Sequence, residues 1–597
     1  MKARVCVAAL VPALFVLIAG AAWAQGADSA GRSDTGSLAP HDIQGAGHVS
    51  PYNRERVENL VGQVTATTLR GFYVESLDAD DDPATSEGLF AETIRAPEVE
   101  PGDVIRMSGR IAEEYPGGQS SGYLSVTKIL RPRVEIIERN RPLPDPTRLG
   151  SAGRMPPTEV ISDDSDGNVE ESHFDPENDG IDFYESLEGM RVVINEALSV
   201  GVVHTAYGEI FVLADRGRGA GERTERGGIV VREGDFNPER ILIDYKEEFP
   251  PYIENGTPRV AVGDVFTEPI VGVVTYSWGN YKVLPLDRLP RVTPRRLERE
   301  RVAPAGDPSV LSVAAFNVYN LGGQNEVAHF ADVAETIVDG LASPDIIALS
   351  EIQDSDGAGR SSRTDSDVTE RRLLAAIDAA GGPDDYVFFD IDPEMNADGG
   401  APNANIRVAF LYRSSRVGAG AAERVAPESR AFVGARKPLA MEFAFRGERL
   451  VVISNHFSSK GGDGALFGRS QPPVLGSEPQ RILQAREVAD YAADVLRRDP
   501  EAHIIVAGDL NDFAFSLPLR VLTDGGLVNL AEALLPESEI YSYIYEGNSQ
   551  VLDHILVSPG LIEATNATVE YVHRYAEYLF QDRWSDHDPV LARFAFE

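Results

Sequence analysis

From Ser312 to the C-terminus, short apolar runs alternate with segments of helical periodicity, and this alternation constrains the fold more than any other feature of the chain. Buried strands interleaved with helices are typical of an α/β domain. We predict strands over residues 312–318, 345–350, 406–412, 450–454, 503–507 and 554–557. The clearest helix is predicted over 478–497, where apolar residues recur at helical spacing and Ser477 and Gln480 form a capping box.

Polar residues stand at the ends of nearly all these predicted strands. They are Asn317, Glu351, Asn455, His456, Asp509, Asn511, Asp553 and the run Ser585–Asp588. A carboxylate at a buried strand end is costly unless it is paired. A divalent cation held by oxygen ligands would offset that cost, and so would hydrogen bonds between histidine and aspartate. Each motif alone is a weak signal, but their recurrence along one segment indicates an active site.

These motifs resemble those of the endonuclease/exonuclease/phosphatase superfamily, and more narrowly those of its bacterial extracellular nucleases. The matching segments, in the family's order, are Phe316-Asn-Val-Tyr-Asn-Leu, Ser350-Glu-Ile-Gln-Asp, Ile406-Arg-Val-Ala-Phe-Leu-Tyr-Arg, Asn455-His-Phe-Ser-Ser-Lys-Gly-Gly-Asp, Gly508-Asp-Leu-Asn-Asp-Phe, Leu552-Asp-His-Ile-Leu-Val-Ser and Ser585-Asp-His-Asp-Pro. Upstream, His41-Asp-Ile-Gln-Gly and Gly71-Phe-Tyr resemble the β domain that precedes the catalytic domain in such nucleases. The resemblance implies an α/β four-layered sandwich over 308–597, in which two packed mixed sheets are flanked by helices.

The resemblance also implies roles for individual side chains. It implies Glu351, Asn317 and Asp586 as metal ligands and His456, Asp509, Asn511, Asp553 and His587 as catalytic residues. Lys460, Arg413 and Asn455 are the candidate substrate-binding residues. The expected cofactor is Mg²⁺, with Mn²⁺ or Ca²⁺ as alternatives. Either Asp509 or His587 is expected to activate the attacking water, and the sequence leaves this choice open. Arg413, Arg469 and Arg481 are expected either to contact phosphate or to form ion pairs.

Two positions depart from the family's pattern. Tyr319 stands where some relatives carry a carboxylate, which removes a ligand of a second metal site. Gln353 stands where certain DNases direct an arginine toward the DNA backbone. Together with a formal net charge of −39, Gln353 argues against tight, sequence-specific binding of DNA.

The chain ahead of this half is predicted to be rich in β structure. Residues 46–135 alternate apolar and polar positions between turn clusters, which is typical of a small barrel or sandwich, and we assign an OB-like domain there. Residues 136–186, rich in proline and aspartate, are interpreted as a linker or arm, and residues 187–295 as a second β-rich domain. The acidic loop 78–82 lacks the spacing of an EF-hand, so a solvated turn is favoured there over a Ca²⁺ site.

The N-terminus follows the plan of a secretory signal. Lys2 and Arg4 precede an apolar run that ends at Ala22-Trp-Ala, so we predict cleavage after Ala24 and a flexible lead over 25–45. The single cysteine, Cys6, lies inside this signal, and the mature chain would therefore form no disulfide. Since no other apolar run is long enough to span a bilayer, we expect a secreted or periplasmic protein without a membrane anchor.

The resulting expectation is a secreted, metal-dependent phosphodiesterase, specifically an extracellular endonuclease that hydrolyses DNA, or also RNA, with little sequence preference. One alternative keeps the site but changes the substrate to a phospholipid or phosphoinositide, or makes the enzyme a phosphatase. A less favoured alternative is a catalytically inactive binding protein whose β domains carry the function. The sequence indicates neither a protein partner nor an oligomeric state.

Overall fold

The computed structural model describes residues 37–165, 167–246, 258–359 and 361–596. The predicted signal peptide and most of the predicted lead therefore lie outside the described residues. None of the helices within these ranges is long and apolar enough to cross a membrane. The described residues from Leu38 onward form one compact unit through their internal contacts.

The first β region is a closed barrel of five strands in the order β1-β2-β3-β5-β4, preceded by the short helix α1 (Pro40–Gln44). Its strands are β1 (Arg56–Thr67), β2 (Gly71–Glu75), β3 (Gly88–Glu92), β4 (Val104–Glu114) and β5 (Val126–Glu138). β3 runs parallel to β5, whereas the other neighbours are antiparallel. Buried side chains such as Leu60, Phe72 and Ile129 fill the interior, while Tyr73 packs against the next sheet. The predicted β class of this region is confirmed.

The second β region is a mixed, nine-stranded sheet in the order β15-β12-β9-β10-β11-β14-β13-β8-β6. Its strands are β6 (Thr147–Leu149), β8 (Arg191–Ile194), β9 (Leu198–Ser199), β10 (Glu209–Leu213), β11 (Ile241–Asp244), β12 (Val265–Phe266), β13 (Ile270–Ser277), β14 (Asn280–Pro285) and β15 (Val292–Thr293). The segment interpreted as a linker contributes β6, β7 (Gly167–Asn168) and α2 (Gly180–Glu185). β6 pairs with β8 inside the sheet, and β7 pairs with β23 (Ser470–Gln471). This segment is therefore partly built into the surrounding structure.

The C-terminal region contains two six-stranded sheets. The first, in the order β18-β19-β17-β16-β30-β29, consists of β16 (Val310–Leu321), β17 (Ile346–Ile352), β18 (Tyr386–Phe389), β19 (Arg407–Arg413), β29 (Thr565–Tyr571) and β30 (Val590–Phe596). The second, in the order β20-β21-β22-β24-β28-β25, consists of β20 (Gly418–Arg424), β21 (Leu439–Phe445), β22 (Glu448–His456), β24 (His503–Asp509), β25 (Val528–Asn529) and β28 (Asp553–Val557). Each strand predicted for this region is present.

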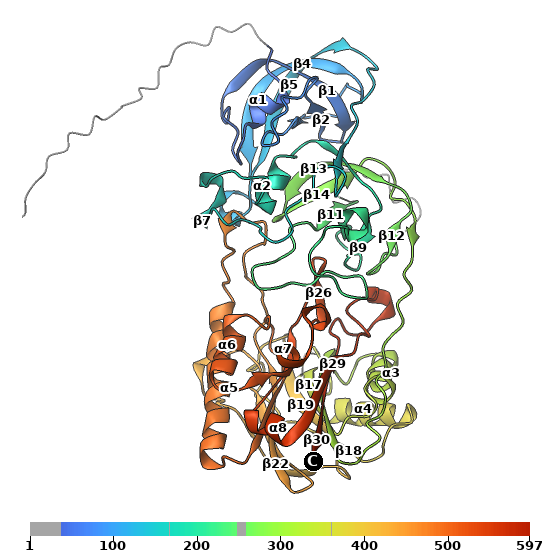
Figure 1. Cartoon of the computed structure of the whole chain (residues 1–597), viewed down its shortest axis with the longest axis vertical. Helices are drawn as coiled ribbons and strands as arrows, with labels where there is room; N and C mark the ends of the chain where they lie inside the picture. The colour runs from blue at the N-terminus through green and yellow to red at the C-terminus, as the bar shows by residue number, and fades with distance from the viewer. Residues whose placement is uncertain (1–36, 166, 247–257, 360, 597) are drawn as a thin grey trace, which may run out of the picture. The chain divides into compact units, whose positions relative to one another are not determined.

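The two sheets share an apolar core, and helices cover their outer faces. Phe410 of the first sheet and Phe443 of the second belong to one buried cluster, with ring centroids 5.6 Å apart. α3 (Val327–Glu335) and α4 (Asp367–Ala379) pack on the first sheet, and α5 (Glu478–Arg498) and α6 (Leu517–Asp524) pack on the second. Figure 1 shows these two helix pairs on opposite sides of the sheets. The shorter helices α7 (Leu530–Leu534) and α8 (Pro559–Ala564) lie near β28 and β29.

The predicted helix over 478–497 is confirmed as α5, but its predicted capping box is wrong. Ser477 has helical backbone angles, φ −89° and ψ −23°, instead of the extended conformation that lets a cap residue reach the third amide. Its hydroxyl donates to Asp463 at 2.7 Å, and Gln480 donates to the carbonyl of Ala431. Tertiary contacts therefore replace the local cap.

Strand direction brings most of the predicted polar residues to one edge of the two sheets. β16 and β17 are parallel, with Asn317 beside Ser350, the residue before Glu351. β22 and β24 are also parallel, with His456 beside Asp509, and antiparallel β28 places Asp553 beside Asp509. Since parallel strands end at the same edge, the polar strand ends converge there.

Candidate active site

Glu351 lies near the end of β17, where the backbone turns out of regular strand geometry. Its φ of 64° is rare for a residue with a side chain, and the pairing of β17 with β19 shifts register at this point. Oε1 accepts a hydrogen bond from Nδ2 of Asn317 at 3.1 Å, and Oε2 accepts one from the amide of Asn320 at 2.9 Å. Burial raises the pKa of Glu351, and the negative charge of Asp586 adds to that effect.

Asn317 joins the two sheets through its side-chain amide. Nδ2 donates to Glu351 and, at 3.1 Å, to Oδ2 of Asp509, so one amide group bridges β17 and β24. Oδ1 accepts a hydrogen bond from the amide of Tyr319 at 3.0 Å. This orientation turns the amide nitrogen, instead of the oxygen expected of a metal ligand, toward the carboxylates.

His587 forms a buried dyad with Asp553. Nδ1 of His587 lies 2.7 Å from Oδ2 of Asp553, and the same oxygen accepts a hydrogen bond from Ser542 at 2.7 Å. Burial would lower the pKa of His587, but the charges of Asp553 and Asp509 raise it well above its ordinary value. The ring also packs against Tyr543, with centroids 4.8 Å apart. The dyad therefore holds a positively charged imidazole in one orientation.

Asp509 lies between the two histidines of the site. Its Oδ2 is 3.5 Å from Nε2 of His456 and 4.0 Å from Nε2 of His587. Oδ1 accepts a hydrogen bond from the amide of Asn511 at 2.9 Å, while the Asn511 side chain donates to the carbonyl of Phe457. Burial raises the pKa of Asp509. Burial and the positive charges of Arg436 and His587 lower the pKa of His456. His456 is thus a neutral imidazole beside Asp509.

Arg436 is a member of this neighbourhood that the sequence analysis missed. Only 8% of it is exposed, and its guanidinium donates to the carbonyl of Phe457. Burial lowers its pKa, whereas the charges of Asp509 and Glu351 raise it. Arg436 lies just before β21 in a segment without a recognisable motif, so no sequence signal marks it.

The donor set of this edge suits a hard divalent cation. Ligand atoms of Asp509, Asp553 and His587 lie within 4.8 Å of one another. Asp553 and His587 of this group are hydrogen-bonded to each other, and Glu351, which the amide of Asn317 links to Asp509, is a further carboxylate of the same edge. A bound cation would offset the burial and the charge of Asp586 that raise the pKa of Glu351, and oxygen donors are those that Mg²⁺ and Mn²⁺ prefer.

Two of the predicted substrate-binding residues, Arg413 and Asn455, do not face the edge where the other polar residues meet. Arg413 lies at the opposite end of the sheet, since antiparallel β19 brings Arg407 beside Ile352, and it pairs with Asp385 at 3.2 Å. Asn455 is fully buried and donates to the carbonyls of Ile453 and Ala507. Both residues are corrections to the predicted set, because neither side chain is available to a substrate at the shared edge.

Lys460, Arg481 and Arg469 form contacts within the protein. Nζ of Lys460 lies 3.1 Å from Asp512 and over the ring of Phe513, with a quarter of the side chain exposed. Arg481 is fully buried against Asp512 at 2.7 Å, and Arg469 donates to the carbonyl of Gln119. Ion pairing is therefore the observed role of Arg481, whereas Lys460 keeps partial access to solvent.

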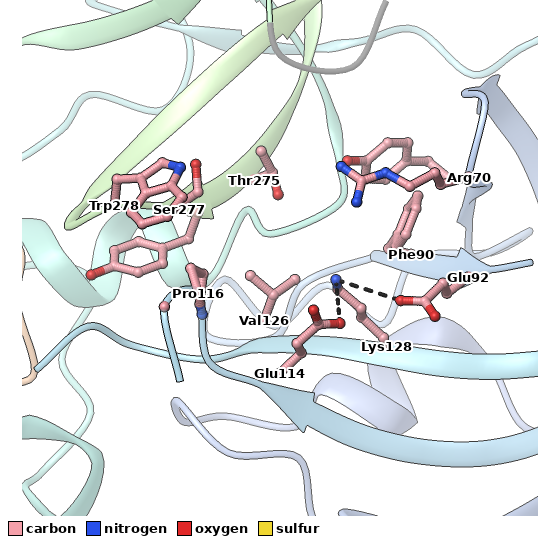
Figure 2. Close-up of a pocket in the computed structure, with 13 residues that line it drawn as sticks. Arg70, Phe90, Glu92, Glu114, Pro116, Val126, Lys128, Thr275, Ser277 and Trp278 are labelled. Atoms are coloured by element: carbon pink, nitrogen blue, oxygen red, sulfur yellow. Dashed lines mark hydrogen bonds and ion pairs between the residues drawn. The ribbon is translucent and has the colours of Figure 1, made fainter. Parts of the chain in front are cut away.

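A separate pocket of about 270 Å³ lies between the barrel and the nine-stranded sheet (Figure 2). Trp278 and Phe90 contribute to its wall, and Lys128 is held there by Glu114 at 2.7 Å and by Glu92 at 3.9 Å. None of the predicted site residues lines it. The candidate active site is therefore the polar edge of the C-terminal sheets, not this pocket.

Two family models match parts of the chain. A model of the "Endonuclease/Exonuclease/phosphatase family" matches residues 399–589, and one described as "Domain of unknown function (DUF8508)" matches residues 148–294. The C-terminal region thus contains an endonuclease/exonuclease/phosphatase family domain. The matched range includes His456, Asp509, Asp553 and His587 but begins after Asn317 and Glu351. No curated protein matches the chain.

Three solved structures that are similar to this chain each cover 48% of it. An endonuclease/exonuclease/phosphatase from Bacteroides vulgatus is 17% identical, with 99% of that chain covered and a TM-score of 0.34. A family protein from Leptotrichia buccalis is 16% identical, with 99% covered and a TM-score of 0.34. D. rerio TDP2, complexed with a single strand DNA product, is 19% identical, with 99% covered and a TM-score of 0.32.

Proposed function

We propose that the endonuclease/exonuclease/phosphatase family domain of this chain is a metal-dependent phosphodiesterase, and that its substrate is a nucleic acid cleaved with little sequence preference. The observation that carries the proposal is the convergence of the Asp553–His587 dyad, Asp509 and Glu351 at one edge of two packed sheets. A dyad beside a carboxylate pair is an arrangement that can move a proton and stabilise a phosphoryl group.

Each of these residues has a separate role in the proposed hydrolysis. Mg²⁺ held by Glu351 and Asp586 would supply positive charge to the phosphate. Asp509, held by Asn317 and Asn511, is placed to accept the proton of the attacking water. His587, kept positive by Asp553, stabilises the negative charge that develops on the phosphoryl group. This assignment favours Asp509 over His587 as the base.

Exposed aromatic side chains near the site support a nucleic-acid substrate. Tyr319 is 48% exposed, and its partial burial together with the charges of Asp586 and Glu351 raises its pKa. Tyr545 is 56% exposed on the same hairpin as Tyr543, which contacts His587. Aromatic rings stack on bases without reading their sequence. Gln353 is buried and donates to Asn320, so it offers no contact to a duplex backbone.

The remaining parts of the proposal concern the N-terminal half and the location of the protein. The order and the parallel β3–β5 pairing of the closed barrel are compatible with an OB-like domain, which would add a further nucleic-acid-binding surface. Export from the cytoplasm is supported by the basic start, the apolar run and the Ala22-Trp-Ala site of the sequence. The domain boundaries inferred from the sequence are part of this proposal, except that β6 and α2 join the segment 136–186 to the second β region.

The activity is tested by incubating purified protein with plasmid DNA, single-stranded DNA, RNA and sphingomyelin, each with Mg²⁺ and with EDTA. We expect cleavage of nucleic acid that EDTA abolishes and Mg²⁺ or Mn²⁺ restores. Glu351→Gln should reduce kcat by about 100-fold or more, because it removes a metal carboxylate while keeping the shape of the side chain. Arg413→Ala is the matched control, since that residue lies at the far end of β19.

The outcomes separate the alternatives. Turnover of sphingomyelin without cleavage of nucleic acid would replace the nuclease by a phospholipid phosphodiesterase. Cleavage that persists in EDTA, or an Arg413→Ala variant as inactive as Glu351→Gln, would contradict the assigned site.

A further inference from the structure

A second group of acidic side chains lies in the second β region, where residues 160–164 run beside the start of α2. Asp163, Asp164 and Asp179 each offer a carboxylate oxygen, and these oxygens lie within 4.8 Å of one another. The backbone holds the two segments together, since the amides of Gly180 and Ile181 donate to the carbonyls of residues 160 and 161 at 3.0 Å. Asp163 also donates its amide to Oδ1 of Asp179 at 3.3 Å. Three like charges are therefore fixed close together.

Asp179 is the member of this group that points to a missing ligand. It is only 1% exposed, and its Oδ2 has no hydrogen-bond partner among the described residues. Its side chain does not cap α2, although the residue occupies the cap position. The hydroxyl of Ser165 is also buried without a partner, and that of Ser162 lies near Asp179 without reaching hydrogen-bond geometry. Burial, together with the charges of Asp182 and Asp163, raises the pKa of Asp179 to about 6.

An ionised, buried carboxylate is unfavourable unless a cation or donors surround it. Within the described residues, Asp164 forms an ion pair with His173, whose side chain is 74% exposed. Asp179 has no ion pair among the described residues, and its hydrogen bond from the amide of Asp163 reaches only Oδ1. Asp163 and Asp164 are exposed, so this side of the group is open to solvent.

We propose that Asp163, Asp164 and Asp179 bind a hard divalent cation of the Ca²⁺ class, which fastens the segment 160–165 to the start of α2. The donors are all oxygens, and Ca²⁺ accepts the irregular geometry that a loop provides. Asp164 also belongs to a neighbouring group with His173 and Asp175, whose mixed donors would suit Zn²⁺. The buried, unpartnered oxygen belongs to Asp179, and it favours the all-oxygen group.

The test uses the full chain carrying Glu351→Gln, so that binding at the candidate active site is weakened and the two sites are read separately. Ca²⁺ is titrated into EDTA-treated, dialysed protein while the heat of binding and the Tm are recorded. We expect one site with a Kd of roughly 1 mM or below, and a Tm rise of about 2 °C or more at saturation. Asp179→Asn should abolish both effects, whereas Glu177→Gln, an exposed charge between Asp175 and Asp179, should keep both.

A second variant keeps the test decisive if Asp179→Asn does not fold. Asp163→Asn combined with Asp164→Asn changes two exposed side chains and should also remove the Ca²⁺ response. No Ca²⁺ response in the Glu351→Gln protein, or an unchanged response in the double variant, would overturn the site. A response to Zn²⁺ alone that His173→Ala removes would overturn its all-oxygen character. Since no substrate is used, failure of the proposed phosphodiesterase activity would not alter these readings.

Discussion

At the scale of single residues, the candidate active site holds two imidazoles in opposite charge states. Asp553 and Asp509 raise the pKa of His587 despite its burial, so that ring is positive. Burial lowers the pKa of His456, and the positive charges of Arg436 and His587 lower it further, so that ring is neutral. One histidine can therefore stabilise negative charge while the other offers an uncharged hydrogen-bonding group.

Asp553→Asn should reduce kcat by about 10²- to 10⁴-fold, because the amide removes the negative charge that orients and charges His587. The measurement is kcat on the nucleic acid that the wild type cleaves best, with circular dichroism to check the fold. Ser542→Ala is the matched control, since it removes the other hydrogen bond to the same carboxylate oxygen. We expect that variant to lose less than about tenfold, in line with one neutral hydrogen bond. Equal losses in the two variants would contradict the role of the dyad.

At the scale of elements, the segment between β22 and α5 is anchored by a buried ion pair. Arg481 of α5 is fully buried, and its Nε lies 2.7 Å from Oδ2 of Asp512. Its guanidinium also donates to Ser477 at 2.7 Å and to the carbonyl of Ser459 at 3.2 Å. Asp512 in turn holds Lys460, so one carboxylate connects the loop after β24 to the loop after β22. This network positions His456 and Asn511 at the ends of their strands.

Asp512→Ala should cost about 3–5 kcal/mol of unfolding free energy, because it leaves the Arg481 charge buried without its partner. Denaturant unfolding of the full chain measures the loss. Arg449→Ala provides the comparison, since Arg449 is 41% exposed and pairs with Glu442 and Asp499 at the surface. Removing such exposed pairs should cost less than about 1 kcal/mol. A smaller loss for Asp512→Ala than for Arg449→Ala would be inconsistent with a buried anchor.

At the scale of the whole molecule, polar contacts connect the β regions to each other and to the C-terminal region. His48, just ahead of β1, lies 2.7 Å from Asp182 of α2 and is only 5% exposed. Asn237 donates to Asn548 at 2.7 Å, and both side chains are buried. Asn548 belongs to β27 (Asn548–Gln550), which pairs with β26 (Tyr543–Tyr545), the strand whose Tyr543 contacts His587. The second β region therefore supports a hairpin of the candidate active site.

The contact between His48 and α2 should make stability depend on pH in the alkaline range. Burial alone would lower the pKa of His48, but hydrogen bonds and charges from Asp182 and Glu185 raise it from 6.5 to about 10. A raised histidine pKa gives stability that is fully present below pH 6.5 and is lost as the pH rises toward 10. Over this window the folded chain holds one more proton than the unfolded chain, a slope of about 1.4 kcal/mol per pH unit.

Urea unfolding of the full chain at pH 6, 8 and 9.5 measures that slope. His48→Gln and Asp182→Asn should each flatten it, because each removes one partner of the buried pair. The decline in stability above pH 6.5 would have another origin if both variants kept the wild-type slope.

Local patterns of the sequence predicted the strands of the C-terminal region and the polar residues at their ends. Apolar periodicity is a property of neighbouring residues, so it survives in a single sequence. The Asp553–His587 contact was also predicted, but through resemblance and not through spacing. The same local reasoning failed at Ser477, where a contact with Asp463 replaced the capping box.

What the sequence by itself determined is therefore the α/β character of the C-terminal half, the β character of the regions before it, and the chemical types gathered at the site. The tertiary structure alone decided which side chains meet. Antiparallel pairing carried Arg413 to the far end of β19, and burial turned Asn455 inward. Contacts from other strands brought Arg436 to the site and turned the amide nitrogen of Asn317 toward Glu351 and Asp509. Strand direction and side-chain orientation depend on partners distant in the chain, and no local pattern encodes them.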